Sequence, residues 1–392
     1  MSGKALRVLA ASALAGCLAI PSLSRPANDL TVHEWGTFTS VAGPDGEAVE
    51  WLPLTGSTDL PAFVEHFRDG QFKCGLRGTL RMETPVLYFY SARETTVSVK
   101  VAFAKGLITE WYPHASAVEP AVVRPQGNPD GSIRWDRVRL MPGSHAAFPA
   151  DDRDNHYYAA RNTSATPLRV KAQAGDQDER FLFYRGVSSA AMPLAARLTA
   201  EGKVHLENHG TGEISAVMLI ESRGGKLGYR VAGPVRDQTL LDPPPLTAAA
   251  DSMLRDLESI LIARSLYLDE ARAMIATWRH SWFEEGSRIL YVLPAPAVSA
   301  ILPLAVSPAP VSTVRVFVGR LELVTPATER AVELAFQNHD QPALDKYRRF
   351  LEPILNAMIA NAHADPARTM QLRRYLDSVY SYACRSPWPA GA

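Results

Sequence analysis

Short segments of alternating apolar and polar residues are the clearest pattern in the chain. Between Thr95 and Phe103, three valines and Phe103 take every second position, while Ser98 and Lys100 lie between them. A period of two predicts a β-strand with one buried and one wet face. Similar segments predict strands at 32–41, 80–90, 108–112, 133–140, 168–172, 180–184, 203–207 and 214–221. Turn signals such as Asn128-Pro129-Asp130-Gly131 separate them, which favours antiparallel sheets packed as a β-sandwich.

Helical periodicity dominates after the proline run at 243–245 and predicts helices at 247–264 and 269–282. One earlier helix is predicted, at 60–68, and a later one at 344–362 should be kinked by Pro353. Two strands should interrupt the helices, near 288–293 and 312–324. In the second, the apolar phase changes across Gly319-Arg320, which predicts a β-bulge.

These elements predict an α+β protein. A β-rich, sandwich-like domain should span residues 29–241, and an α-rich domain with two further strands should span residues 246–392. A chain of this length usually divides into two domains. In the alternative, the two late strands complete the N-terminal sheets, and both segments form one unit.

The first 24 residues predict an export signal. Lys4 and Arg7 precede an apolar run from Val8 to Ile20 that is too short to cross a bilayer. Leu14-Ala-Gly-Cys17 also reads as a lipobox, which would place a lipid anchor on Cys17; the alternative is cleavage after Ser24. The protein should therefore be exported, and be periplasmic, secreted or lipid-anchored to the envelope.

Charge and cysteine content narrow the possible partners. The chain has 41 basic and 41 acidic residues and no basic run, which argues against nucleic acid as a partner. Beyond the lipid anchor, no later apolar run is long enough to span a membrane. Without the leader, Cys74 and Cys384 remain, either as a disulfide or as two free buried thiols.

Three glutamates in apolar or aromatic surroundings are the candidate catalytic groups. Glu34 lies in His33-Glu-Trp35-Gly-Thr-Phe, on the side of the strand that should face the core, while His33 and Trp35 face the opposite way. Glu83 and Glu110 pose the same problem, because a buried carboxylate needs a partner or a raised pKa.

Carboxylates beside aromatic rings suit sugar chemistry, in which one acid protonates and another assists. His33, Trp35, Trp111 and Arg185 are the candidate binding residues. The alternative is structural, with Arg81, Arg185 or Arg320 pairing with the glutamates in buried salt bridges.

A possible divalent-metal site lies at His205-Leu-Glu207-Asn-His209. On a strand these three side chains share a face, which gives the ligand set of a catalytic zinc or a facial triad. A polar strand face explains the same residues, and Asn208-His209-Gly210 reads as a turn. The cofactor is otherwise unknown.

Several blocks taken together resemble an uncharacterised family of exported bacterial proteins. The most distinctive is His33-Glu-Trp-Gly-Thr-Phe-Thr39, and the others are 81–90, 107–113, 156–161, 181–186, 281–294 and 314–326. The resemblance implies that both halves form one evolutionary unit. It supplies no activity, cofactor or catalytic residue.

Two functions follow as expectations. The first is a binding or scaffold protein of the cell envelope that recognises an extracytoplasmic ligand or polymer. The second is a secreted hydrolase that acts on an extracellular polymer such as a polysaccharide, through paired carboxylates or a bound metal. An enzyme should hold at least two of the glutamates in one open cleft, whereas a binding protein should bury them in arginine pairs.

Overall fold

A computed structural model describes residues 29–52, 60–67, 76–120, 130–152, 155–362 and 364–385, with side chains up to residue 380. Its fold is mixed, with mainly antiparallel sheets in the N-terminal part and helices at the C-terminus, as predicted. The predicted leader, the lipobox at Cys17 and the loop with Cys74 lie outside the described residues, as does the side chain of Cys384. Within them, no helix is both long enough and apolar enough to cross a membrane.

The main sheet has nine strands in the order β14-β13-β16-β18-β1-β3-β10-β5-β2. Their bounds are Lys226–Ala232, Val217–Arg223, Gly286–Val292, Ser312–Leu323, Thr31–Ala42, Leu80–Tyr90, Leu182–Ser188, Gly106–Tyr112 and Glu65–His66. The pairing of β1 with β18 is parallel, while every other neighbouring pair is antiparallel. The two late strands therefore complete the N-terminal sheet, which is the single-unit alternative.

Two smaller sheets accompany the main sheet. One contains β17 (Leu304–Ser307), β4 (Thr95–Phe103), β7 (Gly131–Leu140), β8 (Leu168–Ala172) and β9 (Gly175–Glu179), with β6 (Ala117–Glu119) paired to β7. The other contains β11 (Leu194–Leu198), β12 (Val204–Asn208) and β15 (Gln238–Leu241). The largest hydrophobic core draws residues from all three sheets, for example Phe38, Val99 and Leu206.

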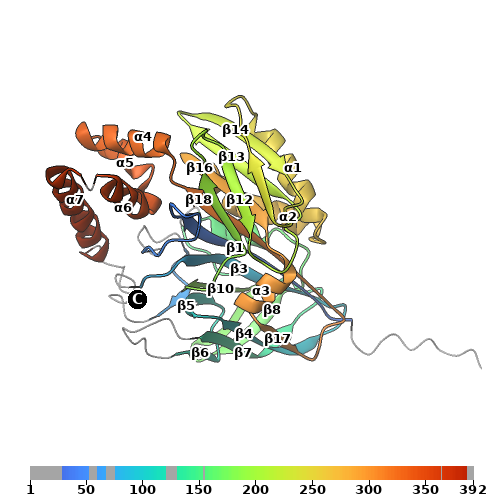
Figure 1. The fold of residues 1–392 in the computed structure, drawn as a ribbon. Helices are drawn as coiled ribbons and strands as arrows, with labels where there is room; N and C mark the ends of the chain where they lie inside the picture. The colour runs from blue at the N-terminus through green and yellow to red at the C-terminus, as the bar shows by residue number, and fades with distance from the viewer. Residues whose placement is uncertain are drawn as a thin grey trace, which may run out of the picture.

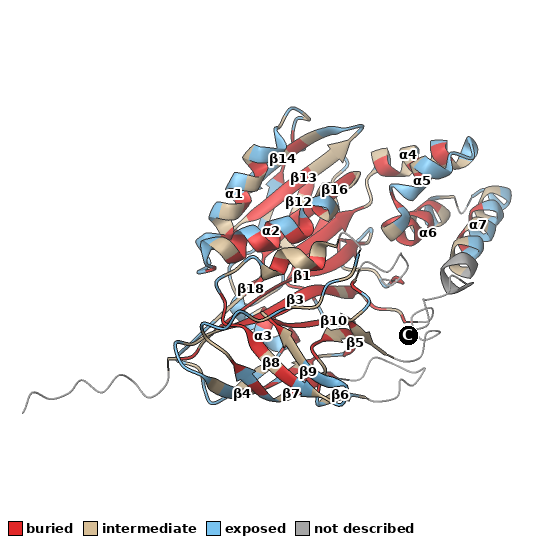
Figure 2. Ribbon diagram, turned by 180° about the vertical axis from the view of Figure 1, so that it is seen from behind, coloured by how far each residue is buried: buried red, intermediate tan, exposed pale blue. Residues whose placement is uncertain are grey.

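The opposite face of the main sheet is covered by helices (Figure 2). Helices α1 (Ala250–Ile262) and α2 (Leu268–Trp282) pack on it with the 3₁₀ helix η2 (His156–Arg161), and α3 (Ala295–Ile301) follows β16. The C-terminal helices form a separate group in Figure 1 around a core that includes Trp51 and Leu355. They are α4 (Pro326–Gln337), α5 (Gln341–Asp345), η3 (Arg348–Phe350), α6 (Leu351–Asn361) and α7 (Pro366–Arg385).

Three local predictions are wrong. Residues 60–67 form no helix, because Glu65 and His66 pair with β5 as an edge strand. Pro353 does not kink a long helix, because the predicted helix is interrupted before this residue and Pro353 lies in the first turn of α6. Strand β18 has no bulge at Gly319-Arg320, because its register with β1 and β16 is continuous.

The change of pattern in β18 has a different cause. Val316 and Val318 face α1 and α2, and Arg320 and Glu322 continue on that same face as buried charges. Leu321 and Leu323 face the core beneath, so the strand alternates regularly throughout. A buried ion pair has interrupted the apolar pattern, with no change in the strand.

Candidate functional site

Helix α2 begins over the first half of β1. Near its start, Glu270 is fully buried and contacts Nδ1 of His33 on β1 at 2.8 Å. The same carboxylate accepts hydrogen bonds from the Tyr90 hydroxyl (2.7 Å) and from the Tyr267 backbone N–H (2.9 Å) that begins the helix. Because a capping carboxylate also binds a strand histidine, the helix start is fixed over the start of β1.

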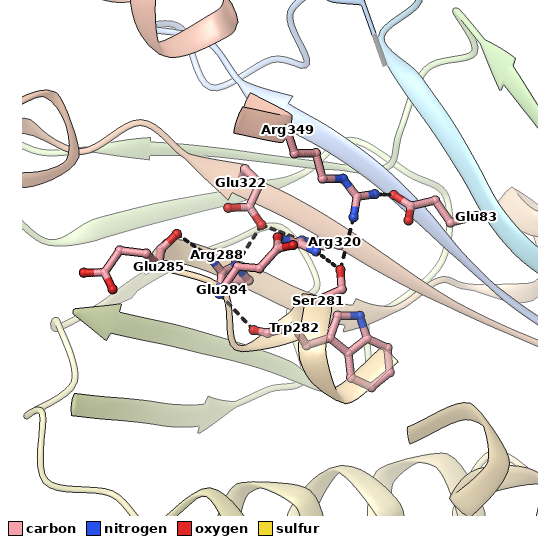
Figure 3. A network of polar contacts seen from close by, with 9 residues as sticks. All are labelled: Glu83, Ser281, Trp282, Glu284, Glu285, Arg288, Arg320, Glu322 and Arg349. Carbon is pink, nitrogen blue, oxygen red and sulfur yellow. Dashed lines mark hydrogen bonds and ion pairs between the residues drawn. The ribbon is translucent and has the colours of Figure 1, made fainter. Parts of the chain in front are cut away.

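The end of α2 is attached to β18 and η3. The Ser281 hydroxyl accepts hydrogen bonds from Arg320 on β18 and from Arg349 on η3, the latter at 3.1 Å. Arg349 in turn forms an ion pair with Glu83 on β3 (Figure 3). In the sheet, Glu83 lies beside Thr37 of β1, and Arg320 lies beside Thr39.

These two attachments place the helix residues against particular strand residues. From Glu270 to Ser281 a helix rises about 17 Å, and from position 33 to position 38 a strand rises about 17 Å. The same rises place Trp278, about 12 Å along the helix, level with Thr37. Ideal rises thus bring the second half of α2 level with the stretch of β1 that contains Thr37 and Thr39.

A network of buried charges surrounds this end of the helix (Figure 3). Glu322 accepts from Arg288 (2.8 Å) and Arg320 (2.5 Å), and Glu284 accepts from Arg320 at 2.9 Å. Arg288 also donates to the backbone carbonyls of Trp282 and Glu285, which binds strand β16 to the end of α2. Burial opposes the charge of Glu322, but the two guanidinium groups outweigh it and lower the pKa of the carboxyl. Burial also lowers the pKa of Arg288; an arginine nevertheless stays charged at neutral pH.

Polar groups share this side of the sheet in neighbouring strands. We name the set the polar face; it consists of Thr37 and Thr39 of β1, Arg81 and Glu83 of β3, Arg185 of β10, Glu110 of β5 and Arg320 of β18.

Several neutral groups at this face have no partner. Thr37 and Thr39 are 1% and 0% exposed, and neither hydroxyl has a hydrogen-bond partner within the described part of the chain. The indole N–H groups of Trp278 and Trp282 are also buried without a partner among the described residues. Buried polar groups in native proteins are almost always hydrogen-bonded, and several exceptions on one face of a structure mark a place where water or a ligand would bind.

Glu34 projects to the other side of the sheet, as predicted. It lies between Arg315 of β18, whose Nε donates at 2.5 Å, and Tyr184 of β10, whose hydroxyl also donates to it. Burial and the Glu34 charge raise the pKa of Tyr184 well above its ordinary value. Glu34 is thus held in a buried salt bridge, as in the structural alternative, but with a partner that the sequence did not single out.

Glu110 and Arg185 are neighbours on β5 and β10. The Thr109 hydroxyl donates to Glu110, and Nη2 of Arg185 lies 3.2 Å from Nε2 of His156, whose ring contacts that of Trp278. Trp111 projects away from them, and its indole donates to Glu65 at 2.9 Å. Arg185, Glu83 and Glu110 are therefore brought to the polar face, while Glu34 and Trp111 are not.

Two open cavities in the described part of the chain lie elsewhere. Two cavities of about 480 and 390 Å³ follow the outer side of α2 and share Arg272 and Ala276 in their linings. No predicted site residue lines either of them. In these described cavities there is no cleft around paired glutamates.

The three predicted metal ligands lie together on the surface of β12 and the turn after it. His205 and His209 both contact Glu207, at 3.1 and 3.3 Å, and His209 contacts Glu47 at 2.9 Å. The attached histidines help to lower the pKa of Glu207, chiefly through the hydrogen bond from His209. Among the described residues, no group of three or more His, Cys, Asp or Glu side chains has the arrangement needed to hold a metal ion.

Sequence reasoning missed three partners. They are Glu270, which contacts His33, Arg315, which pairs with Glu34, and Arg349, which pairs with Glu83. Each pair joins residues more than 200 positions apart, so no local pattern links them. Trp278 lies within the helix predicted at 269–282, and Thr37 lies within the strand predicted at 32–41, but neither residue was singled out. Comparison with protein-family models and with curated proteins gives no match for this chain.

Proposed function

We propose that this protein is an exported envelope protein that binds an extracytoplasmic ligand at the polar face. The observation that carries the proposal is the contrast between paired charges and unpaired neutral groups. Glu34, Glu83 and Glu322 each have arginine partners, whereas Thr37 and Thr39 have none among the described residues. Paired glutamates are what a binding protein was expected to have, and unpaired hydroxyls are what a ligand would complete.

A binding role also explains why the unpaired groups persist. A buried hydroxyl without a hydrogen bond costs about 1–3 kcal/mol of stability. Valine has the same shape without that cost, and strands accept it readily. Retaining two threonines side by side in a central strand is reasonable if a ligand supplies their missing partners, because function commonly opposes stability at binding sites.

The test is the pair of variants Thr37→Val and Thr39→Val, with Thr96→Val as a matched control on an exposed strand position. We expect each inner variant to raise the free energy of unfolding of the ligand-free protein by about 1 kcal/mol, while the control changes little. Urea unfolding measures this. A loss of stability in the inner variants would mean that protein groups already satisfy both hydroxyls, and the proposed site would be withdrawn.

A polymer hydrolase is the second candidate, and one observation favours it. Glu83 and Glu110 lie on the same face with β10 and Arg185 between them, which separates their backbones by two strand spacings, about 10 Å. Inverting glycosidases hold their carboxyl groups about 6.5–9.5 Å apart. Release of reducing ends from polysaccharides that is abolished by Glu110→Gln, in a variant that still folds, would favour this candidate over binding alone.

Export, the possible lipid anchor at Cys17, the β-sandwich-like packing and the resemblance to exported bacterial proteins belong to this proposal. The continuous nine-stranded sheet supports treating both halves as one unit. Cell fractionation of the wild type and of the variant Cys17→Ser tests the proposed cellular location. Recovery of the wild-type protein from the cytoplasm would contradict it.

A further inference from the structure

Exposed apolar side chains gather at the end of the main sheet where β1 begins. Among the described residues, eight large apolar side chains are exposed, and four of them lie at this end. Together with the loop at 303–313 they form a surface that we name the apolar end; the four are Ile262, Tyr267, Leu268 and Val311. Single exposed apolar residues are common on protein surfaces, but a cluster of them marks a place of interaction.

Two segments that are distant in the sequence meet at the apolar end. In the turn between α1 and α2, the Tyr267 ring lies 4.4 Å from the ring of His33 on β1. In the loop between β17 and β18, the Val311 backbone N–H donates to the carbonyl of Leu30 at 2.8 Å. Val314 of β18 lies beside His33 in the sheet and is half-buried. The turn and the loop are therefore neighbours at the start of β1.

The loop has an unusual composition for an exposed segment. From Ile301 to Val314 the chain contains no charged residue, although most positions between 303 and 313 are exposed. Charged side chains are costly inside a bilayer, so their absence suits contact with lipid. In the turn, the exposed Arg264 and Tyr267 are of the types that lie at the level of lipid headgroups, because each has an apolar part and a polar tip.

The charged groups nearest to the apolar end already have protein partners. In the turn between β3 and β4, Arg93 pairs with Asp29 at 3.6 Å and Glu94 pairs with Arg139 at 2.8 Å. At the start of α2, Asp269 accepts hydrogen bonds from the backbone and hydroxyl of Ser164. The apolar side chains therefore determine what this surface can bind.

The expected lipid anchor lies close to the same end in the sequence. Asp29 accepts hydrogen bonds from the Ser91 hydroxyl and the Ala92 backbone, which fixes residue 29 at the start of β1. Only residues 18–28 separate it from Cys17, and a chain of that length spans at most about 40 Å. The other end of β1 belongs to the C-terminal helices, since Val41 packs into their core. An anchor on Cys17 therefore holds the apolar end, rather than the C-terminal helices, near a membrane.

We propose that the apolar end rests on a lipid bilayer, with Leu268 and Val311 in contact with acyl chains and with Arg264 and Tyr267 among the headgroups. This inference rests on the proposed export and lipid anchor, and it adds the orientation of the protein on the membrane. Contact of this kind lies in the interface and needs no membrane-spanning helix.

Lipid photolabelling tests the proposal on the full chain. The protein is reconstituted into vesicles of phosphatidylethanolamine and phosphatidylglycerol whose acyl chains carry a photoactivatable diazirine, and mass spectrometry identifies the labelled peptides. The test variant is Leu268→Asp with Val311→Asp, whose side chains are 46% and 61% exposed. The matched control is Leu334→Asp with Met370→Asp on α4 and α7, at 60% and 51%. Tyr267 is kept, because its backbone N–H begins α2.

We expect lipid to label peptides that cover 262–268 and 303–313 in the wild type and in the control. In the test variant this labelling should fall about fivefold or more, because aspartate is costly in a bilayer. All four substituted side chains are exposed, so Tm should be the same in the three proteins.

Other results overturn the inference and separate it from the proposal on which it rests. Labelling confined to residues 1–28 would disprove contact at the apolar end while leaving the anchor in place. No lipid labelling anywhere in the chain would disprove the anchor as well. Equal labelling of the two segments in the test variant and the wild type would show that Leu268 and Val311 do not make the contact. A wild type that elutes as a dimer, with a monomeric test variant and no labelling of these segments, would assign the surface to a second copy of the chain.

Discussion

At the scale of single residues, burial rather than chemical type decides what each glutamate does. Glu34 is fully buried between Arg315 and Tyr184, and Glu83 is buried against Arg349. By contrast, Glu94 forms an ion pair with Arg139 at 2.8 Å on the surface. The same kind of pair has different consequences in these places, because water screens the exposed one.

The substitution Glu34→Gln measures this difference. It leaves the buried guanidinium of Arg315 without a counter-charge, and we expect a loss of about 3–5 kcal/mol in the free energy of unfolding. Urea denaturation gives the value, and the matched substitution Glu94→Gln should change it little. A Glu34→Gln protein with wild-type stability and no ligand binding would instead assign Glu34 to the functional site.

Residue identities allowed part of this to be predicted. The alternation of β1 correctly separated Glu34 from His33 and Trp35, because side chains on a strand project to opposite faces. The arginine partners could not be predicted, since Arg315 and Arg349 lie 281 and 266 positions away from Glu34 and Glu83. From the sequence alone, Arg81, Arg185 and Arg320 were the expected partners of the glutamates.

At the scale of elements, buried ion pairs as well as apolar contacts hold α2 to β16 and β18. Arg288 joins the carbonyl groups that end α2 to Glu322 on β18, and Arg320 joins Ser281 to the same carboxylate. This is the place where the sequence pattern was misread as a bulge. Apolar periodicity identifies elements reliably only where the buried face is apolar.

This junction should make stability depend on acidity. The pKa of Glu322 is lowered in the folded protein from an ordinary value of 4.5, so the unfolded chain takes up a proton at higher pH than the folded one. The stabilisation is therefore complete above pH 4.5 and is lost as the pH falls through the folded-state pKa. Urea unfolding at a series of pH values below 5 should show a shallower acid dependence for Glu322→Gln than for the wild type. Equal slopes in both proteins would contradict the role given to this carboxylate.

Most elements followed from the sequence, and the exceptions share a physical cause. The strands with a clear period of two, such as β4 and β7, were predicted within a few residues. Strands β9, β11, β14 and β15 were missed because they are short or lie at sheet edges, where polar residues suffice on both faces. The helix predicted at 269–282 was also placed within one residue, since α2 spans Leu268–Trp282.

At the scale of the whole molecule, the two segments on either side of the proline run do not form separate sheets. Strand β18 lies between β16 and β1 and pairs with β1 from Thr31 to Ala42. Without it, β1 would become an open edge twelve residues long, and β13 and β14 would lose their connection to the rest of the main sheet.

A fragment that ends at residue 241 should therefore fail to fold. We expect it to aggregate or to unfold without a cooperative transition, because β1 lacks its parallel partner and Glu34 lacks Arg315. Circular dichroism during heating, compared with the full chain, distinguishes the outcomes. A cooperative transition in the fragment would show that residues 29–241 are an independent domain, as the sequence first suggested.

The parallel pair of β1 and β18 also governs when folding can finish. The two strands are joined through 281 positions of chain, and they occupy the middle of the main sheet. Closing so long a loop is slow, because the entropy is lost before the contacts form. The central sheet cannot be completed until almost the whole polypeptide has emerged. Until β18 has been synthesised, β1 therefore lacks one of its two neighbours in the main sheet.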